Sequence, residues 1–225
     1  MFETFGFETL TPVQASLYLA LVLGAAFGVL AEITRFCLRR ALTGAEATDR
    51  RAAGGVWLMA LAVALIGTQA AVATDLITFE AHRFFATDLP ALAIVLGGLA
   101  FGAGMVLTRG CASRLAVLSA SGNLRAAFVL VLFAIAAHAT LKGVLAPVSA
   151  SLAGITLPLG EYTSLAALPG GALPYTVALA LAFLALALRS GAPKLHLALA
   201  VLIGLIVPAA WVGTGFVLFD EFDPI

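Results

Sequence analysis

Six long runs of apolar residues, each free of charged side chains, constrain this chain more than any other feature. A helix needs about 20 mostly apolar residues to cross the hydrocarbon layer of a bilayer. The composition agrees, because 62% of the residues are hydrophobic and 11% are charged. We predict an all-α polytopic membrane protein, one membrane domain over residues 1–225, with spans at residues 9–31, 52–74, 89–108, 126–141, 173–188 and 195–213.

A stretch between the fourth and fifth runs is uncharged for most of its length but is interrupted by prolines. Pro147, Pro158, Pro169 and Pro174 each remove a backbone donor and disfavour a helix interior. We predict a surface or re-entrant loop here rather than another span.

Basic side chains are distributed unevenly between the connections of the predicted spans. Ten of the twelve lysines and arginines fall in the first, third and fifth connections, and Arg83 and Lys142 fall in the second and fourth. Because Lys and Arg near span ends stay on the cytoplasmic side, we predict that both termini are periplasmic. The formal net charge is zero, so no overall basic field favours a nucleic-acid partner.

An internal repeat is centred on the two cysteines. The segments LGAAFGVLAEITRFCLRRAL and GGLAFGAGMVLTRGCASRLA align without a gap, and eight of 17 positions are identical. Shared hydrophobicity alone does not produce so many matches, so we predict two copies of one unit, at about residues 9–51 and 89–125. Besides Ala26/Ala100, the identical pairs are Gly24/Gly98, Phe27/Phe101, Gly28/Gly102, Thr34/Thr108, Arg35/Arg109, Cys37/Cys111 and Arg40/Arg114.

The repeated glycines are spaced four residues apart and therefore share one helix face. Small residues at this spacing allow a second membrane helix to approach closely, within the chain or from a partner. We assign a helix-packing role to Gly24, Phe27, Gly28, Gly98, Phe101 and Gly102.

The repeated cysteines are candidates for chemistry. A lone membrane cysteine is usually an inert buried side chain, but recurrence at one repeat position indicates a role. Arginines two residues before and three residues after each thiol favour its thiolate form or attract an anion. Arginines also anchor the cytoplasmic ends of spans, and we assign this role to Arg39, Arg50, Arg51 and Arg125. Gly110 leaves room beside the second sulfur. The candidate substrate-binding residues are Cys37, Cys111, Arg35, Arg109, Arg40, Arg114 and Gly110.

These motifs resemble the YeeE/YedE family of sulfur-transport membrane proteins. The resemblance rests on RFC at residues 35–37, on FGAGMVLTRGCASR at 101–114 with GNLR at 122–125, and on DEFDPI at 220–225. It implies uptake of thiosulfate or a related small sulfur anion through the bacterial inner membrane. It also implies that Cys37 and Cys111 offer S–H hydrogen bonds to the passing anion without being consumed.

The full-length family pattern continues beyond DEFDPI into a second half with further spans and another functional cysteine. This chain stops at Ile225 and resembles the N-terminal half. The resemblance therefore implies a homodimer or a second membrane subunit, unless the sequence is truncated. A small soluble sulfur-carrier protein in the cytoplasm is a further expected partner.

Simple counting places both thiols just beyond the cytoplasmic end of a span, whereas a constriction would place them deeper. Helices interrupted inside a protein-lined cavity reconcile the two positions. We predict breaks at TRFC and TRGC, with short helices that begin in LRRAL and ASRLAVL.

Other polar residues in the spans are weaker candidates. His138 and Lys142 lie one helical turn apart and either mark a pathway or extend to the interface. Gln69 suits a hydrogen bond between helices, and His82 and His196 are isolated near span ends. Two cysteines 74 residues apart and three scattered histidines match no common metal spacing. We expect no metal and no cofactor.

Three classes of function are compatible with the sequence. A permease for a small sulfur anion explains the spans, the duplicated thiols and the arginines, without an enzyme's acid–base set. A membrane thiol enzyme, such as a sulfurtransferase or disulfide oxidoreductase, predicts a Cys-x-x-Cys or a nearby histidine base, and neither is present in the sequence. A non-transporting scaffold subunit explains the glycines but leaves the repeated Thr-Arg-x-Cys without a role.

Overall fold

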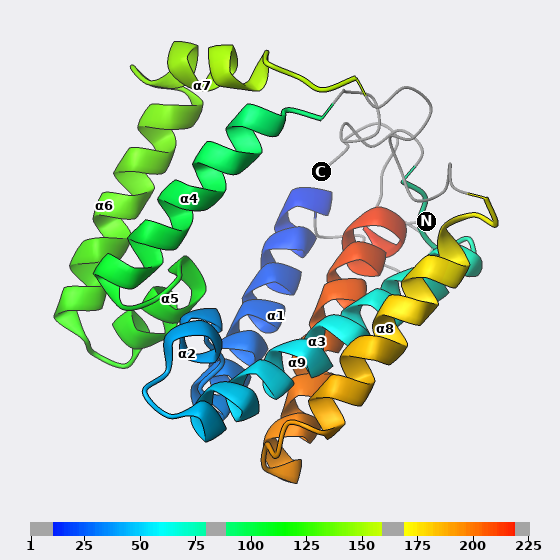
Figure 1. Ribbon diagram of the computed structural model, residues 1–225. Helices are drawn as coiled ribbons and strands as arrows, with labels where there is room; N and C mark the ends of the chain where they lie inside the picture. The colour runs from blue at the N-terminus through cyan, green and yellow to red at the C-terminus, as the bar shows by residue number, and fades with distance from the viewer. Residues whose placement is uncertain (1–10, 80–88, 159–168, 219–225) are drawn as a thin grey trace.

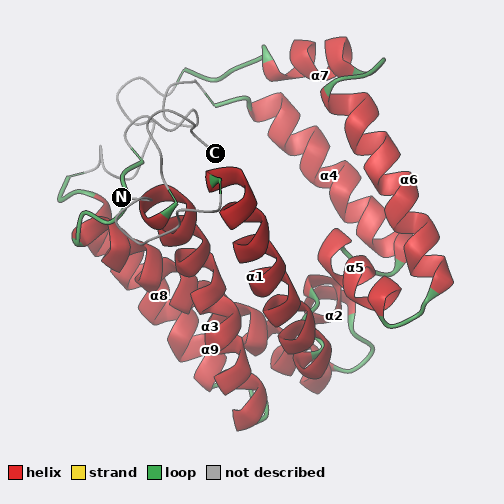
Figure 2. Cartoon of the chain, turned by 180° about the vertical axis from the view of Figure 1, so that it is seen from behind, coloured by secondary structure: helices red, strands yellow, loops and turns green. Residues whose placement is uncertain are grey.

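The chain folds into a set of α-helices, as predicted for an all-α polytopic membrane protein. The computed structural model describes residues 11–79, 89–158 and 169–218. Within these residues the chain forms nine α-helices, a π-helical turn and an isolated β-bridge between Leu89 and Leu157. The elements, labelled in Figures 1 and 2, are α1 (Pro12–Thr34), α2 (Leu38–Thr43), α3 (Ala47–Ala73), α4 (Ala91–Thr108), α5 (Ala112–Ala120), α6 (Leu124–Leu141), α7 (Ala146–Ala153), α8 (Ala172–Leu188), α9 (Lys194–Val212) and η3 (Gly213–Val217).

Six long helices, α1, α3, α4, α6, α8 and α9, occupy the positions of the six predicted spans. Five segments of the described chain are long and apolar enough to cross a membrane by length and composition. The sixth, α8, is apolar throughout but has 17 residues. The predicted polytopic arrangement is therefore confirmed, with α8 as the shortest of the six.

The start of α1 follows from its sequence. The hydroxyl of Thr11 accepts a hydrogen bond from the Gln14 N–H at 3.3 Å, and the Gln14 side chain accepts one from the Thr11 N–H at 3.2 Å. This reciprocal pair satisfies two of the donors that a helix N-terminus leaves free. Pro12 follows in the first turn, where its missing N–H costs nothing.

The best-packed part of the molecule is the bundle of α3, α8 and α9. Its buried centre is built largely from small and branched side chains: Val56, Met59, Ala60, Ala187, Ala200 and Ile203. Gly204 is required at the α3–α9 crossing, because a Cβ there would lie 2.5 Å from the Ala60 carbonyl oxygen and 2.7 Å from the Val63 Cβ. The close helix contacts inside this chain therefore use small residues of α3 and α9.

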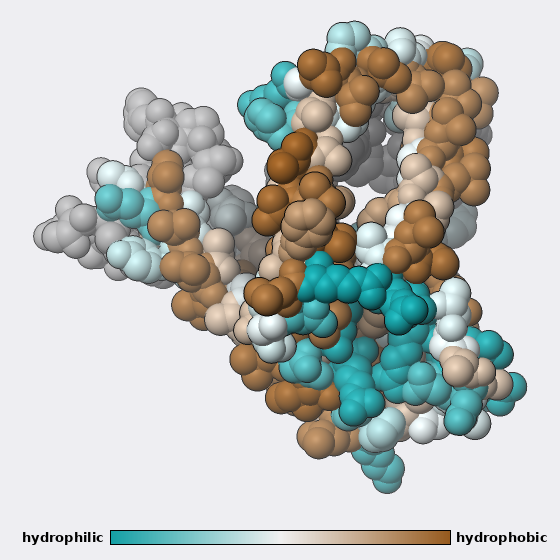
Figure 3. Space-filling view, turned by 90° about the vertical axis from the view of Figure 1, so that its left-hand side faces the viewer, coloured by the Kyte–Doolittle hydropathy of each residue, from teal (hydrophilic) through white to brown (hydrophobic). Residues whose placement is uncertain are grey.

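The helices α4, α5, α6 and α7 form a separate group beside this bundle (Figures 1 and 2). No residue of α4 is buried, and Ala126 is the buried residue of α6. Large apolar side chains such as Leu99 and Phe128 are 68% and 65% exposed. Figure 3 shows these apolar surfaces as upright brown columns above a hydrophilic end. In a membrane protein such surfaces face lipid or another membrane chain.

Part of the proline-rich stretch forms helix where the sequence predicts a loop. Ala146–Ala153 form the short helix α7, in which Pro147 lies in the first turn. Pro174 likewise lies in the first turn of α8 (Ala172–Leu188). Both prolines occupy positions that need no intrahelical donor. The prediction of a loop was therefore wrong over residues 146–153, although α7, with eight residues, is too short to be a further span. Pro158 and Pro169 lie outside the helices.

Candidate functional site

The two copies of Thr-Arg-x-Cys have the same backbone geometry. Arg35 ends α1 and Arg109 ends α4 in the left-handed conformation, with φ of 51° and 62°. Two residues later, Cys37 and Cys111 are the N-cap residues of the short helices α2 and α5. The predicted breaks at TRFC and TRGC are therefore confirmed. Each thiol lies at the junction between a long helix and a short one.

The repeated threonines contribute to this turn. The Thr34 hydroxyl donates to the Leu30 carbonyl at 2.7 Å, and the Thr108 hydroxyl donates to the Gly104 carbonyl at 2.8 Å. A side-chain bond to the carbonyl four residues earlier stabilises the last turn of a helix and keeps a polar group satisfied in lipid. Thr34 is 1% exposed. The identical threonine thus has a structural role beside the left-handed arginine.

Both thiols are free and buried, with 7% of Cys37 and 9% of Cys111 exposed. The Cys111 sulfur lies 3.2 Å from the Ser113 hydroxyl oxygen, which is hydrogen-bond distance for a thiol. These are the positions that the sequence singles out, and the structure keeps both side chains out of solvent.

An open cavity of about 490 Å³ lies where the two units meet. Figure 3 shows the hydrophilic end of the molecule, below the apolar columns, from one side. Five arginines line this cavity, and we call it the arginine basin. Cys37 is in its wall, whereas Cys111 is not among its lining residues. The lining residues are Arg35, Cys37, Arg39, Arg40, Thr43, Gly44, Ala45, Arg109, Arg114 and Leu118.

Two of the five arginines are engaged in ion pairs, which the sequence alone does not indicate. The Arg40 guanidinium binds the Asp49 carboxylate, with Nε to Oδ2 at 2.9 Å, and so ties α2 to the first turn of α3. The Arg114 Nη1 donates to the Glu32 carboxylate at 2.8 Å, across the boundary between the two units. Asp49 and Glu32 are residues of the site that the repeat could not reveal, because neither is repeated. Arg40 and Arg114 thus hold the geometry of the basin.

Replacing Glu32 with glutamine is expected to lower substrate uptake about fivefold with little change in protein level. The Arg114–Glu32 pair joins α5 to α1, and an ion pair with a half-exposed carboxylate contributes about 1 kcal/mol. The double swap Glu32→Arg with Arg114→Glu restores the pair in reverse and should recover part of the uptake. Glu46→Gln, at the exposed N-cap of α3, is the matched control. Wild-type uptake by Glu32→Gln would show that the pair does not position the site.

The two units differ in the residue between arginine and cysteine. In the first unit Phe36 stacks on Trp57 with ring centroids 4.9 Å apart and packs edge-on against Phe27 at 6.2 Å. In the second unit Gly110 is buried, and a Cβ there would make ordinary contacts of 3.6 Å with Arg114 and Leu115. Gly110 is therefore not forced by crowding or by its backbone conformation. Its role in admitting substrate stays a prediction.

The repeated glycines do not pack against another part of the described chain. A Cβ added at Gly24, Gly28, Gly98 or Gly102 would meet no atom within 4 Å. Phe27 packs beside the buried cluster of α3, α8 and α9, whereas Phe101 is 49% exposed. Of the two settings predicted for these glycines, close contact within the chain is not found in the described residues, and contact with a partner stays a prediction.

The weaker candidates lie away from the arginine basin. Gln69 lines an apolar pocket of about 190 Å³ between α3 and α8. His138 is exposed near the end of α6, and the Lys142 N–H donates to its carbonyl at 2.9 Å. His196 is half-buried in α9. His82 lies outside the described residues.

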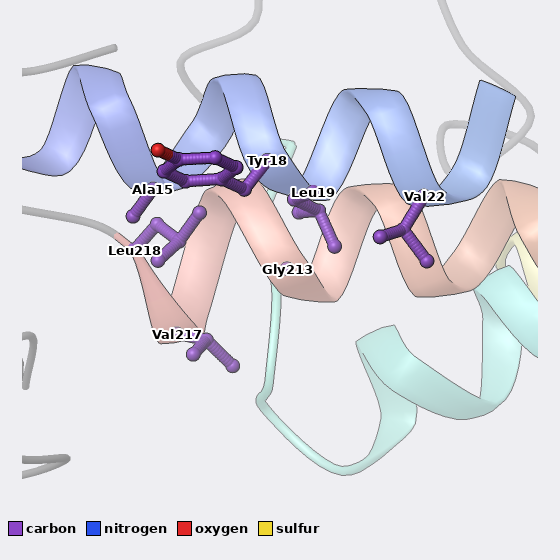
Figure 4. Close-up of a pocket in the computed structure, with 7 residues that line it drawn as sticks. All are labelled: Ala15, Tyr18, Leu19, Val22, Gly213, Val217 and Leu218. Carbon is purple, nitrogen blue, oxygen red and sulfur yellow. The ribbon is translucent and has the colours of Figure 1, made fainter. Parts of the chain in front are cut away.

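Another pocket, of about 370 Å³, lies between α1 and the π-helical turn η3 (Figure 4). Its walls are apolar apart from the Tyr18 hydroxyl, so it offers an anion no charged donor. We assign it no part in anion binding. Its lining residues are Ala15, Tyr18, Leu19, Val22, Gly213, Val217 and Leu218.

Comparison with known families bears directly on these two thiol units. The sequence pattern of the family described as "Sulphur transport" matches residues 33–201, which is more than half of the chain and includes both copies of Thr-Arg-x-Cys. The chain belongs to the sulphur transport family. The resemblance to YeeE/YedE proteins is thereby confirmed.

A curated relative agrees with this membership of the sulphur transport family. The thiosulfate transporter TsuA of Escherichia coli (strain K12) is 33% identical over 93 residues, which are 41% of this chain and 25% of TsuA. The match therefore covers about a quarter of that relative. No solved structure matches this chain.

Proposed function

We propose that this chain is a membrane permease, or a permease subunit, for a small sulfur-containing anion of the thiosulfate type. The observation that carries the proposal is the pair of buried, free thiols at matching helix breaks, in a member of the sulphur transport family. The arginine basin beside Cys37 supplies the positive charge that such an anion requires. Uptake of labelled thiosulfate by intact cells that carry wild-type or cysteine-free protein tests the proposal.

The proposed mechanism uses the thiols as hydrogen-bond donors. An S–H group is a weak donor, so it can replace part of the anion's hydration without holding it tightly. Passage requires sites that bind well enough for entry and weakly enough for release. No covalent bond forms or breaks in this scheme, and the side chains proposed for it are Cys37 and Cys111, together with Arg35, Arg109, Arg40, Arg114 and Gly110.

The ion pairs divide these arginines into two groups within the proposal. Arg40 and Arg114 are compensated by Asp49 and Glu32, so they act on substrate through the shape of the site. Arg35 and Arg109 form no ion pair within the described residues. Each lies two residues before the cysteine of its repeat, and both line the basin. They are the repeated arginines that are free to meet an anion.

A thiol enzyme is the alternative class with a specific requirement. A sulfurtransferase or disulfide oxidoreductase needs a base or a resolving cysteine near the reactive thiol. The sequence has no Cys-x-x-Cys, and the side chain recorded against the Cys111 sulfur is Ser113. The geometry therefore supports a permease better than an enzyme.

We further propose a homodimer or a second membrane subunit, and a small sulfur-carrier protein in the cytoplasm, as partners.

We predict that both termini face the periplasm and that α2 and α5 lie toward the cytoplasm. The helix ends alternate as this requires, because α2, α5 and the α8–α9 connection lie at one end of the molecule and α7 lies at the other (Figure 1). Ten of the twelve basic residues belong to the connections that include α2, α5 and the α8–α9 turn. A phosphatase reporter fused after Ile225 should be active, since it functions in the periplasm. A fusion active only as a cytoplasmic reporter would contradict the prediction.

A further inference from the structure

The arginine basin carries more positive charge than its ion pairs compensate. Five guanidinium groups line it, and the carboxylates paired with them are those of Asp49 and Glu32. Arg35, Arg39 and Arg109 form no ion pair within the part of the chain that the structure describes. Three positive charges therefore converge on one cavity, where their mutual repulsion is relieved by a bound anion.

Arg39 adds an independent observation that points to a ligand. Its Nε is cut off from solvent and has no hydrogen-bond partner within the described residues. A buried donor that lacks an acceptor is costly, so a shift of the Arg39 side chain that brings its Nε to an anion in the basin removes that cost. The position is also specific to the first unit, because the aligned residue of the second unit is Ser113. The sequence indicates only a membrane anchor here, whereas the structure places Arg39 in the wall of the basin.

We infer that the basin is an oxyanion site, in which Arg35, Arg39 and Arg109 bind the oxygen atoms of a divalent tetrahedral sulfur anion. Guanidinium groups present N–H donors in a planar fork that fits oxyanions, and they form charge-assisted hydrogen bonds. The volume of about 490 Å³ accommodates such an anion with water around it. The inference rests on the proposed function in one respect: the natural ligand is the transported anion.

This assignment separates two kinds of recognition in one pathway. The thiols meet an anion as weak S–H donors, whereas the basin recognises charge and oxygen atoms. The basin should therefore bind sulfate as well as thiosulfate, although sulfate lacks the outer sulfur atom. The basin has Cys37 in its wall and lies at the hydrophilic end of the molecule (Figure 3). It therefore serves as the site that the anion occupies between the thiols and the side of the membrane predicted to be cytoplasmic.

The test measures binding of sodium sulfate and sodium thiosulfate to the purified full chain in neutral detergent by isothermal titration calorimetry. Both anions should bind, with dissociation constants within about threefold of each other, because the basin contacts oxygen atoms that both present. Arg39→Gln should weaken both by about tenfold, the effect of losing one charge-assisted hydrogen bond. Arg39→Lys, which keeps the charge but not the fork, should fall between. Arg189→Gln, outside the basin, is the matched control.

A second arginine variant and a comparison of lipids complete the test. If Arg39→Gln does not fold, Arg109→Gln replaces it with the same expectation, because Arg109 is exposed and ends α4 without an ion pair. The titration is repeated in nanodiscs of neutral lipid and of lipid that contains phosphatidylglycerol. Sulfate binding that persists with phosphatidylglycerol supports a soluble anion, whereas its loss assigns the basin to a lipid headgroup and overturns the proposal.

Two other results would overturn the oxyanion site. These are binding of thiosulfate without any binding of sulfate, and equal affinity of Arg39→Gln and the Arg189→Gln control. Cellular uptake is a separate readout. Thiol-dependent uptake by cells whose purified protein binds no sulfate would refute the basin and leave the proposed function standing. Sulfate binding by a protein that supports no uptake would do the reverse.

Discussion

Cells that carry the double variant Cys37→Ala with Cys111→Ala are expected to lose about 99% of their thiosulfate uptake while the protein still inserts at normal levels. Each thiol is proposed to offer one hydrogen bond to the passing anion, and a bond to a charged group contributes about 1.5 kcal/mol or more. Two such losses correspond to about a 100-fold lower rate. Insertion should be preserved, because alanine is as small and apolar as either site requires.

The single variants and the serine variants refine this expectation. Each single alanine variant should lose about tenfold, and serine at either position should give a smaller loss, because it keeps a donor but changes its size and polarity. The combined serine variant should depart from additivity, because both hydroxyls, unlike alanine, remain as donors of altered strength for the same passing anion. Ser119→Ala, on α5 but outside the basin lining, is the matched control. Wild-type uptake by the double alanine variant at normal protein level would refute the thiol relay.

The sequence predicts the parts of this fold that depend on local chemistry. Uncharged runs mark the long helices, and the breaks at Thr-Arg-x-Cys are predicted by reconciling the run ends with the deeper thiol position that the family resemblance implies. The structure adds the local reason: the threonine bonds back into the last turn, and the arginine ends the helix in a left-handed conformation. A short helix then begins after each cysteine. Both the run ends and the repeat are visible in the sequence, so the positions of the breaks need no knowledge of the tertiary arrangement.

The parts that the sequence does not predict depend on contacts between distant segments. Glu32 and Arg114 are 82 residues apart and belong to different units, so no periodicity links them. Arg39 resembles an anchor in the sequence and becomes part of a cavity wall through the position of α2 beside α5. The short helix α7 was missed because prolines were read as breaks, although a proline in the first turn is compatible with a helix.

The same distinction applies to the glycines. Spacing alone assigns Gly24, Gly28, Gly98 and Gly102 to helix contacts, but spacing does not show which helix they contact. The α3–α9 crossing uses Gly204, where a Cβ would lie 2.5 Å from a backbone oxygen. The repeated glycines remain open within the described chain. Two sets of small residues thus have different surroundings: Gly204 lies at a close helix crossing, and the repeated glycines have no neighbour within the described residues.

We expect this chain to function as part of an assembly, either a homodimer or a complex with a second membrane subunit. The glycine faces of α1 and α4 are open, and α4 buries none of its residues. The arginine basin, with Cys37 in its wall, is lined by residues of both repeat units. A polar pathway needs protein around its whole circumference, because each polar group left facing hydrocarbon costs about 2 kcal/mol or more.

Purification in mild detergent is therefore expected to yield a dimer or a complex, measured by size-exclusion chromatography with light scattering. Leucine at Gly98 or Gly102 should shift the protein toward the monomer and reduce uptake about tenfold or more, because a branched side chain prevents close approach of a helix at a glycine face. Gly54→Leu, on α3 and also without a neighbour within 4 Å, is the control for a leucine added to an open helix surface. A purified monomer that carries thiosulfate into liposomes, at protein densities too low for pairing, would refute the assembly. In that case the open faces of α1 and α4 must contact lipid, and the pathway must be closed by this chain alone.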